Sequence, residues 1–139
     1  MSVESFIDTN ILVYAAAAAP HEEEKRRRAF QCIEMGEFGL STHVLAEFYV
    51  TTTRKVRRPI PVEDAAEWVG WLSEFEVIAV DAALVRIGIE LSQRFQISYW
   101  DGAVVGAAEA LGAATLYTED LNHGQLYGSV RVVNPFLEG

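Results

Sequence analysis

The sequence predicts an α/β fold in which helices cover both faces of a mostly parallel sheet. Short apolar runs typical of strands alternate with longer helical runs along nearly all of the 139 residues. Strands that alternate with helices are joined by right-handed crossovers, which place the strands in parallel within one sheet. Half of the residues are hydrophobic, which is enough for a substantial buried core. We therefore expect one compact domain over residues 1–139.

The N-terminal half is expected to hold two strands and three helices, with a recognisable signal at most of their ends. Asp8 closes the first strand, and Pro20 stops the helix that follows it. Gly36 ends the next helix, and Ser41 provides an N-cap for the third. In chain order, these elements are a strand at 3–7, helices at 9–18 and 22–35, a strand at 38–40 and a helix from 42 to about 55.

The C-terminal half follows a loop marked by Pro59 and Pro61. Ser98 caps the last helix of this half, and Gly112 ends it. In chain order, the expected elements are a helix beginning at 62, a strand at 76–80, helices at 82–95 and 99–111, and strands at 114–117 and 130–133. In parallel sheets of this kind, functional side chains gather at the carboxyl ends of the strands.

The charge of the chain is unevenly distributed. A formal net charge of −9 argues against nucleic-acid binding through bulk electrostatics. Eight of the eleven lysines and arginines nevertheless lie in two clusters, at 25–28 and 54–58. Glutamates at 22–24 precede the first cluster at helical spacing, so ion pairs along one helix explain it. The second cluster has no acidic neighbours, and contact with RNA or with a protein partner is open there.

The composition indicates a soluble protein of the cytoplasm. Cys32 is the only cysteine, so no intramolecular disulfide forms, which suits a reducing compartment. The first residues have neither the basic nor the apolar segment of a signal peptide. The longest apolar run, at 11–20, is too short to cross a bilayer. We therefore expect no membrane partner.

Four acidic residues stand among apolar or small neighbours, unlike most of the twenty in the chain. They are Asp8, Glu47, Asp101 and Asp120. A carboxylate in apolar surroundings is unfavourable unless it is paired or bound to a metal, and no lysine or arginine accompanies these four in sequence. Mg²⁺ and similar hard cations prefer oxygen ligands, whereas no cluster of cysteine and histidine competes as a zinc site. The four carboxylates therefore predict a site for a divalent cation that activates water against a phosphodiester.

Small polar residues flank two of these carboxylates. Asn10 and Thr118 lie at predicted strand ends, where they can orient a ligating carboxylate or a water. Thr9 is open to the same role, or to that of a helix N-cap. We expect Trp100 to pack behind Asp101, and Trp68 and Trp71 to contribute to the core or to a dimer face.

Four segments, taken together, resemble a known family. They read Phe-Ile-Asp-Thr-Asn-Ile-Leu-Val-Tyr-Ala at 6–15, Ser-Thr-His-Val-Leu-Ala-Glu at 41–47, Ser-Tyr-Trp-Asp-Gly-Ala at 98–103 and Leu-Tyr-Thr-Glu-Asp-Leu at 116–121. In this order and over nearly the whole chain, they resemble PIN-domain ribonucleases. Within that family they are most similar to the VapC toxins of toxin–antitoxin pairs.

The resemblance implies a Rossmann-like α/β/α sandwich and an endoribonuclease, dependent on Mg²⁺ or Mn²⁺, that hydrolyses RNA phosphodiester bonds. It also implies a VapB-like antitoxin that blocks the site, and a homodimer. The four carboxylates above fall on the family's acidic positions, and Asn10 and Thr118 fall on its polar positions. Many relatives carry a further acidic residue just after the first segment, but residues 16–19 are all alanine here. That auxiliary acidic group is therefore missing.

Three alternative functions share some of these sequence features. Phosphotransferases of the haloacid-dehalogenase type also begin with a strand-end aspartate, but they need a second aspartate where this chain has Asn10. A non-catalytic, metal-independent interaction module has no need for all four carboxylates. A PIN nuclease of general RNA processing, or one that acts on DNA, remains an alternative to a toxin.

Overall fold

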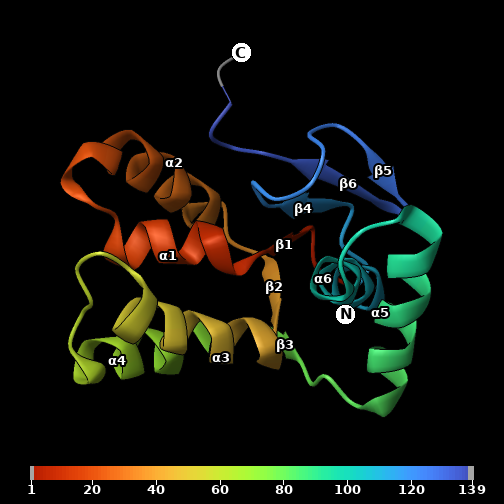
Figure 1. Ribbon diagram of the computed structural model, residues 1–139, viewed down its shortest axis with the longest axis horizontal. Coiled ribbons are helices and arrows are strands. Elements are labelled where there is room, and N and C mark those ends of the chain that lie inside the picture. Colours follow the sequence, from red (N-terminus) through yellow and green to blue (C-terminus); the bar gives the residue numbers. More distant parts are fainter. Residues whose placement is uncertain (1, 138–139) are drawn as a thin grey trace.

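The computed structural model describes residues 2–137, and its centre is a mixed sheet. Its strands are β1 (Ser5–Ile7), β2 (Phe38–Ser41), β3 (Glu76–Ile78), β4 (Thr115–Tyr117), β5 (Leu126–Tyr127) and β6 (Val130–Val133). They follow the order β3-β2-β1-β4-β6-β5, and every pair is parallel except β5 with β6. The predicted α/β fold with a mostly parallel sheet is thereby confirmed (Figure 1).

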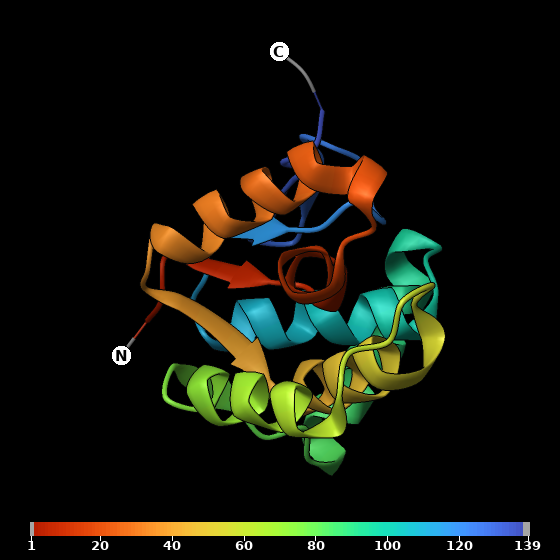
Figure 2. The ribbon, with the colours of Figure 1, turned by 90° about the vertical axis from the view of Figure 1, so that its left-hand side faces the viewer.

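Helices lie on both faces of this sheet. They are α1 (Thr9–Ala17), α2 (Glu23–Glu34), α3 (Thr42–Val50), α4 (Val62–Leu72), α5 (Ala82–Phe95) and α6 (Tyr99–Ala110). A 3₁₀ turn, η1 (Pro20–Glu22), joins α1 to α2, and a π-helical turn, η2 (Thr51–Lys55), extends α3. Figure 2 shows α2 on one side of β1 and β4, and α6 on the other side. No helix among residues 2–137 is long and apolar enough to cross a membrane.

The helix ends predicted at Ser41, Ser98 and Gly36 are present in the structure. The hydroxyl of Ser41 accepts from the backbone N–H of Val44 at 3.1 Å, and that of Ser98 accepts from Asp101 at 3.1 Å. Gly36 follows α2 with a φ of +68°, a conformation that favours glycine at a helix end. These bonds fix the first turns of α3 and α6, the two helices that carry Glu47 and Asp101.

Several details differ from the expected elements, and the first strand, expected from residue 3, begins at Ser5. The helix expected up to residue 55 is α-helical only as far as Val50, because its last turn is η2. The strand expected at 76–80 ends at Ile78. Strand β5 was not predicted, because its two residues are too few to give a periodic signal.

Close packing between α5 and α6 sets the position of the first turn of α6. A Cβ added at Gly102 would lie 2.9 Å from the backbone nitrogen of Ser92, and closer still to the carbonyl oxygen of Gly88. Only glycine permits this approach of the two helices. Asp101 is the neighbour of Gly102, so the contact also fixes where Asp101 lies.

The register of β1 against β4 brings together the residues that follow these strands. Ile7 is the partner of Tyr117, so Asp8 and Thr118 are the next residues at the same edge of the sheet. The backbone N–H of Asp8 donates to the carbonyl of Tyr117 at 3.0 Å, and that of Thr118 donates to Val133 at 3.2 Å. The carboxyl ends of the central strands therefore form the candidate site.

Candidate active site

Asp8 lies at the centre of the site and is only 5% exposed. Its carboxylate accepts from the backbone N–H of Thr9 at 2.7 Å and from the hydroxyl of Thr118 at 2.8 Å. Burial raises the pKa of Asp8 from 3.8 to about 7, in spite of these two hydrogen bonds, and the carboxylates of Asp120 and Glu47 raise it further. Asp8 is therefore a buried acid without a neutralising cation among the described residues.

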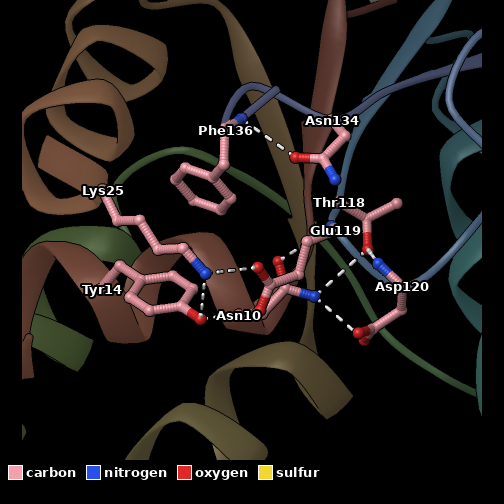
Figure 3. A network of polar contacts seen from close by, with 8 residues as sticks. All are labelled: Asn10, Tyr14, Lys25, Thr118, Glu119, Asp120, Asn134 and Phe136. Atoms are coloured by element: carbon pink, nitrogen blue, oxygen red, sulfur yellow. Dashed lines mark hydrogen bonds and ion pairs between the residues drawn. The ribbon is translucent and has the colours of Figure 1, made fainter. Parts of the chain in front are cut away.

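Thr118 and Asn10 link Asp8 to Asp120, and Figure 3 shows Asn10 beside Thr118 and Asp120. While the Thr118 hydroxyl donates to Asp8, its oxygen accepts from the backbone N–H of Asp120 at 3.1 Å. The side-chain amide of Asn10 donates to Thr118 at 3.2 Å and to the Asp120 carboxylate at 3.0 Å. The two polar residues thus hold two of the predicted carboxylates in fixed relative positions.

Glu47 and Asp101 approach the same edge of the sheet from α3 and α6. Asp101 is half-buried, and its pKa is raised by burial and by the nearby carboxylates of Asp120 and Glu47. Glu47 is exposed and lines the same cavity as Asp8 and Asp120. The fold therefore brings all four predicted carboxylates to one edge of the sheet.

The cavity at this edge has a volume of about 440 Å³. Its polar wall includes Asp8, Asn10 and Asp120. Its lining also includes apolar and basic residues, among them Val13, Ala17, Ala19, Val56, Arg57 and Arg58. The cavity thus combines a concentrated negative charge with room for a larger ligand.

One element of the site was missed by sequence reasoning. Tyr14 donates to Glu119 at 2.8 Å, and the ammonium of Lys25 donates to Tyr14 at 3.1 Å and to Glu119 at 3.3 Å (Figure 3). The same ammonium lies 5.3 Å from the ring of Phe136. The only signal in the sequence was the position of Glu119 beside Asp120.

The first basic cluster is neutralised, although not entirely by the expected pairs. The distances between charged groups are 3.3 Å for Arg26 with Glu23, 3.6 Å for Arg28 with Glu24 and 3.3 Å for Lys25 with Glu119, and Arg27 also pairs with Glu24. Glu22 does not contribute, because its carboxylate accepts from the backbone N–H of Ala19. Ion pairs within one helix therefore explain Arg26, Arg27 and Arg28, whereas Lys25 pairs with Glu119, which lines the cavity.

Trp100 and Thr9 do not have the places that the sequence predicted for them. Trp100 is 59% exposed and stacks on His43 with an interplanar angle of 7°, so the expectation that it packs behind Asp101 is wrong. Thr9 is the first residue of α1, whereas Asp8 is the N-cap. Trp68 packs against the core, as expected, with its ring 5.9 Å from that of Phe48.

The residues present fit a hard divalent cation. Among residues 2–137, no three His, Cys, Asp or Glu side chains are close enough together to form a complete metal cage. Mg²⁺ does not need such a cage, because it is commonly held by one or two carboxylates, several waters and substrate phosphates. A buried carboxylate with a raised pKa and two acidic neighbours is stabilised in its ionised form by a bound cation.

The chain belongs to the PIN-domain family, because residues 5–128 match the model of the PIN domain. The resemblance of the four sequence segments to this family is thereby confirmed. No curated protein matches the chain in sequence.

Solved structures with a similar fold include toxins and toxin–antitoxin complexes. A chain of a toxin–antitoxin complex from Klebsiella pneumoniae is 21% identical, with a TM-score of 0.68, 96% of this chain covered and 98% of that one. VapC20 of Mycobacterium tuberculosis, a toxin that cleaves the sarcin–ricin loop, is 19% identical, with a TM-score of 0.67 and coverage of 84% and 92%. A chain of VapBC2 from Rickettsia felis, bound to a promoter fragment, is 21% identical, with a TM-score of 0.62 and coverage of 92% and 96%. At these identities the similarity concerns the fold.

Proposed function

We propose that this chain is a metal-dependent endoribonuclease that hydrolyses RNA phosphodiester bonds with Mg²⁺ or Mn²⁺. The observation that carries the proposal is the convergence of four carboxylates at the carboxyl ends of β1 and β4, one of them buried with a pKa of about 7. Such a group of uncompensated acids favours a divalent cation, and membership of the PIN-domain family supports the same chemistry.

In this proposal each side chain has a distinct role. Asp8, Asp101 and Asp120 hold the cation, and Glu47 completes the site directly or through a water. The cation stabilises charge on the phosphoryl oxygens and lowers the pKa of a water. The Thr118 hydroxyl favours the ionised form of Asp8, because its hydrogen bond partly offsets the rise in the pKa of that carboxyl caused by burial.

Asn10 has a positioning role in the same scheme. Asn10 follows β1, and its amide donates to Thr118 and Asp120, which both follow β4, so it links the ends of the two strands. The hydrogen bond between the backbone N–H of Glu119 and the Asn10 side-chain oxygen, at 3.4 Å, holds the amide in the orientation that faces Asp120. A fixed geometry of this kind limits the reorganisation needed when substrate binds.

We further propose that the chain is the toxin of a VapBC-type pair, with a VapB-like antitoxin, a homodimeric state and a cytoplasmic location. The similar folds of toxins from other organisms support this assignment. We treat residues 1–139 as one PIN domain. A PIN nuclease of general RNA processing, and a non-catalytic interaction module, are the alternatives.

The test is RNA cleavage by the purified chain with Mg²⁺, with Mn²⁺ and with EDTA. Asp8→Asn and Asp101→Asn remove two of the proposed ligands, and Glu90→Gln removes an exposed charge on α5 as a matched control. We expect metal-dependent cleavage by the wild type and by Glu90→Gln, and none by the two site variants. Cleavage that survives in both site variants, once their folding has been verified by circular dichroism, contradicts the proposed mechanism.

A further inference from the structure

The two basic clusters of the chain differ in whether their charges are already paired. Each cationic side chain at 25–28 has an acidic partner, as described above. Arg57 and Arg58, in contrast, are exposed and have neither an ion pair nor a side-chain hydrogen bond with any residue between 2 and 137. Their full positive charge is therefore available to a ligand.

These two arginines line the cavity that contains the carboxylates. The cavity wall includes Arg57 and Arg58 together with Asp8, Glu47 and Asp120. Arginine side chains and carboxylates thus face one space, although the structure forms no ion pair between them. A ligand in this space meets both acidic and basic side chains.

The backbone before and after the arginines is held in place by hydrogen bonds. The hydroxyls of Thr52 and Thr53 donate to the carbonyls of Phe48 and Tyr49, at 2.8 and 2.7 Å, and these bonds stabilise the π-helical turn η2. Two backbone bonds then close the loop. The N–H of residue 56 donates to Thr51 at 3.1 Å, and that of residue 60 donates to Thr52 at 3.0 Å. The position of Arg57 and Arg58 over the cavity is therefore a feature of the fold.

We infer that Arg57 and Arg58 bind the phosphate backbone of a single RNA strand next to the carboxylate site. The inference rests on the proposed nuclease function. It adds which side chains next to the carboxylates bind the RNA substrate. A phosphate with its cation matches both kinds of charge in the lining, because the carboxylates bind the cation and guanidinium groups bind phosphate oxygens in a bidentate manner. An acidic peptide is repelled by the carboxylates, and a basic peptide is repelled by the two arginines.

The same reasoning excludes the first cluster from this role. Arg26 and Arg27 are also exposed, but each already neutralises a glutamate on α2. A phosphate that approaches them has to compete with an existing ion pair, and no net release of counterions accompanies the exchange. The strand is therefore bound on the α3–η2 side of the cavity and not along α2.

Fluorescence anisotropy of a labelled 12-nucleotide single-stranded RNA tests the inference, measured between 20 and 200 mM KCl with Ca²⁺ in place of Mg²⁺, so that a cation is present on the carboxylates. The double variant Arg57→Ala/Arg58→Ala is compared with Arg26→Ala/Arg27→Ala, which removes the same two positive charges. For one phosphate contact per arginine, the affinity of the first variant is expected to fall about eightfold per arginine at 50 mM salt. The slope of log K against log salt should decrease by about 0.7 per arginine.

The control variant should bind nearly as the wild type does. The inference is overturned if both double variants lose affinity equally, because net charge then explains the effect. It is also overturned if Arg57→Ala/Arg58→Ala binds RNA with the affinity and the salt dependence of the wild type. That result would favour a protein partner as the ligand of the two arginines. Absence of any RNA binding by the wild type at 20 mM KCl overturns it as well. Cleavage by the wild type is measured separately, so each failure is distinguishable from failure of the nuclease itself.

Discussion

The substitution Asp8→Asn should stabilise the metal-free protein at pH 8. The rise in the pKa of Asp8 from 3.8 to about 7 corresponds to about 4 kcal/mol of unfavourable free energy in the ionised, folded state. Asparagine removes this charge, but it loses part of the hydrogen bonding, because its amide nitrogen faces the Thr118 hydroxyl that now donates to Asp8. We therefore expect a net gain of about 1–3 kcal/mol, or about 3–10 °C in Tm.

The stabilisation expected from Asp8→Asn depends on pH. Because the folded protein holds the Asp8 proton more tightly than the unfolded chain does, stability falls as pH rises from about 4 to about 7. The gain from Asp8→Asn should therefore be nearly absent at pH 4 and complete at pH 8. Urea unfolding of the wild type, of Asp8→Asn and of Glu90→Gln at both pH values, in EDTA, measures the difference.

Addition of metal should reduce the difference in stability between Asp8→Asn and the wild type. A cation that binds the wild type with a Kd of about 1 mM adds about 1.4 kcal/mol at 10 mM, and it should add little to Asp8→Asn. A variant less stable than the wild type at pH 8 in EDTA would refute the reasoning, because Asp8 would then have a compensating partner. An equal gain at pH 4 would point to a cause other than its charge.

Three further substitutions test the support around the site. Thr118→Val removes the hydrogen-bond donor to Asp8, so the free energy of unfolding should fall by about 1–3 kcal/mol. The pKa of Asp8 should rise further, so the loss of stability with increasing pH should extend to higher pH. An unchanged dependence of stability on pH contradicts this reasoning. Gly102→Ala should destabilise by about 1–3 kcal/mol in urea unfolding, because its Cβ meets α5, and a neutral result would show that the two helices separate easily. Gly70→Ala, on α4, adds a Cβ that meets nothing within 4 Å and should instead stabilise by about 0.5–1 kcal/mol, because glycine has a lower helix propensity than alanine. A loss of stability would contradict this reasoning.

Much of the fold could be predicted because its signals are local. The serine caps at 41 and 98 determine where α3 and α6 begin, and both act within three residues of sequence. The position of Asp8 directly after an apolar strand was sufficient to place it at the edge of a parallel sheet. The convergence of Asp8 with Thr118 then follows from strand register, because both residues end neighbouring parallel strands.

The remaining features depend on contacts that no local pattern encodes. Lys25 pairs with Glu119, which lies 94 residues away, so the spacing of charges along α2 could not show this contact. The exposure of Trp100 depends on which side of the first turn of α6 faces the sheet, and its neighbours in sequence do not determine that. The availability of Arg57 and Arg58 likewise depends on the π-helical turn, in which threonine hydroxyls compete for backbone carbonyls.

Binding of Mn²⁺ is the measurement that tests the central claim most directly, because the claim is that these carboxylates hold a divalent cation. Electron paramagnetic resonance of free Mn²⁺ gives the bound fraction for the wild type, Asp8→Asn, Asp101→Asn and Glu90→Gln at pH 8. The account predicts binding by the wild type and by Glu90→Gln. It predicts that the two site variants bind Mn²⁺ with an affinity lower by a factor of about ten or more. Equal Mn²⁺ binding by all four proteins would contradict it.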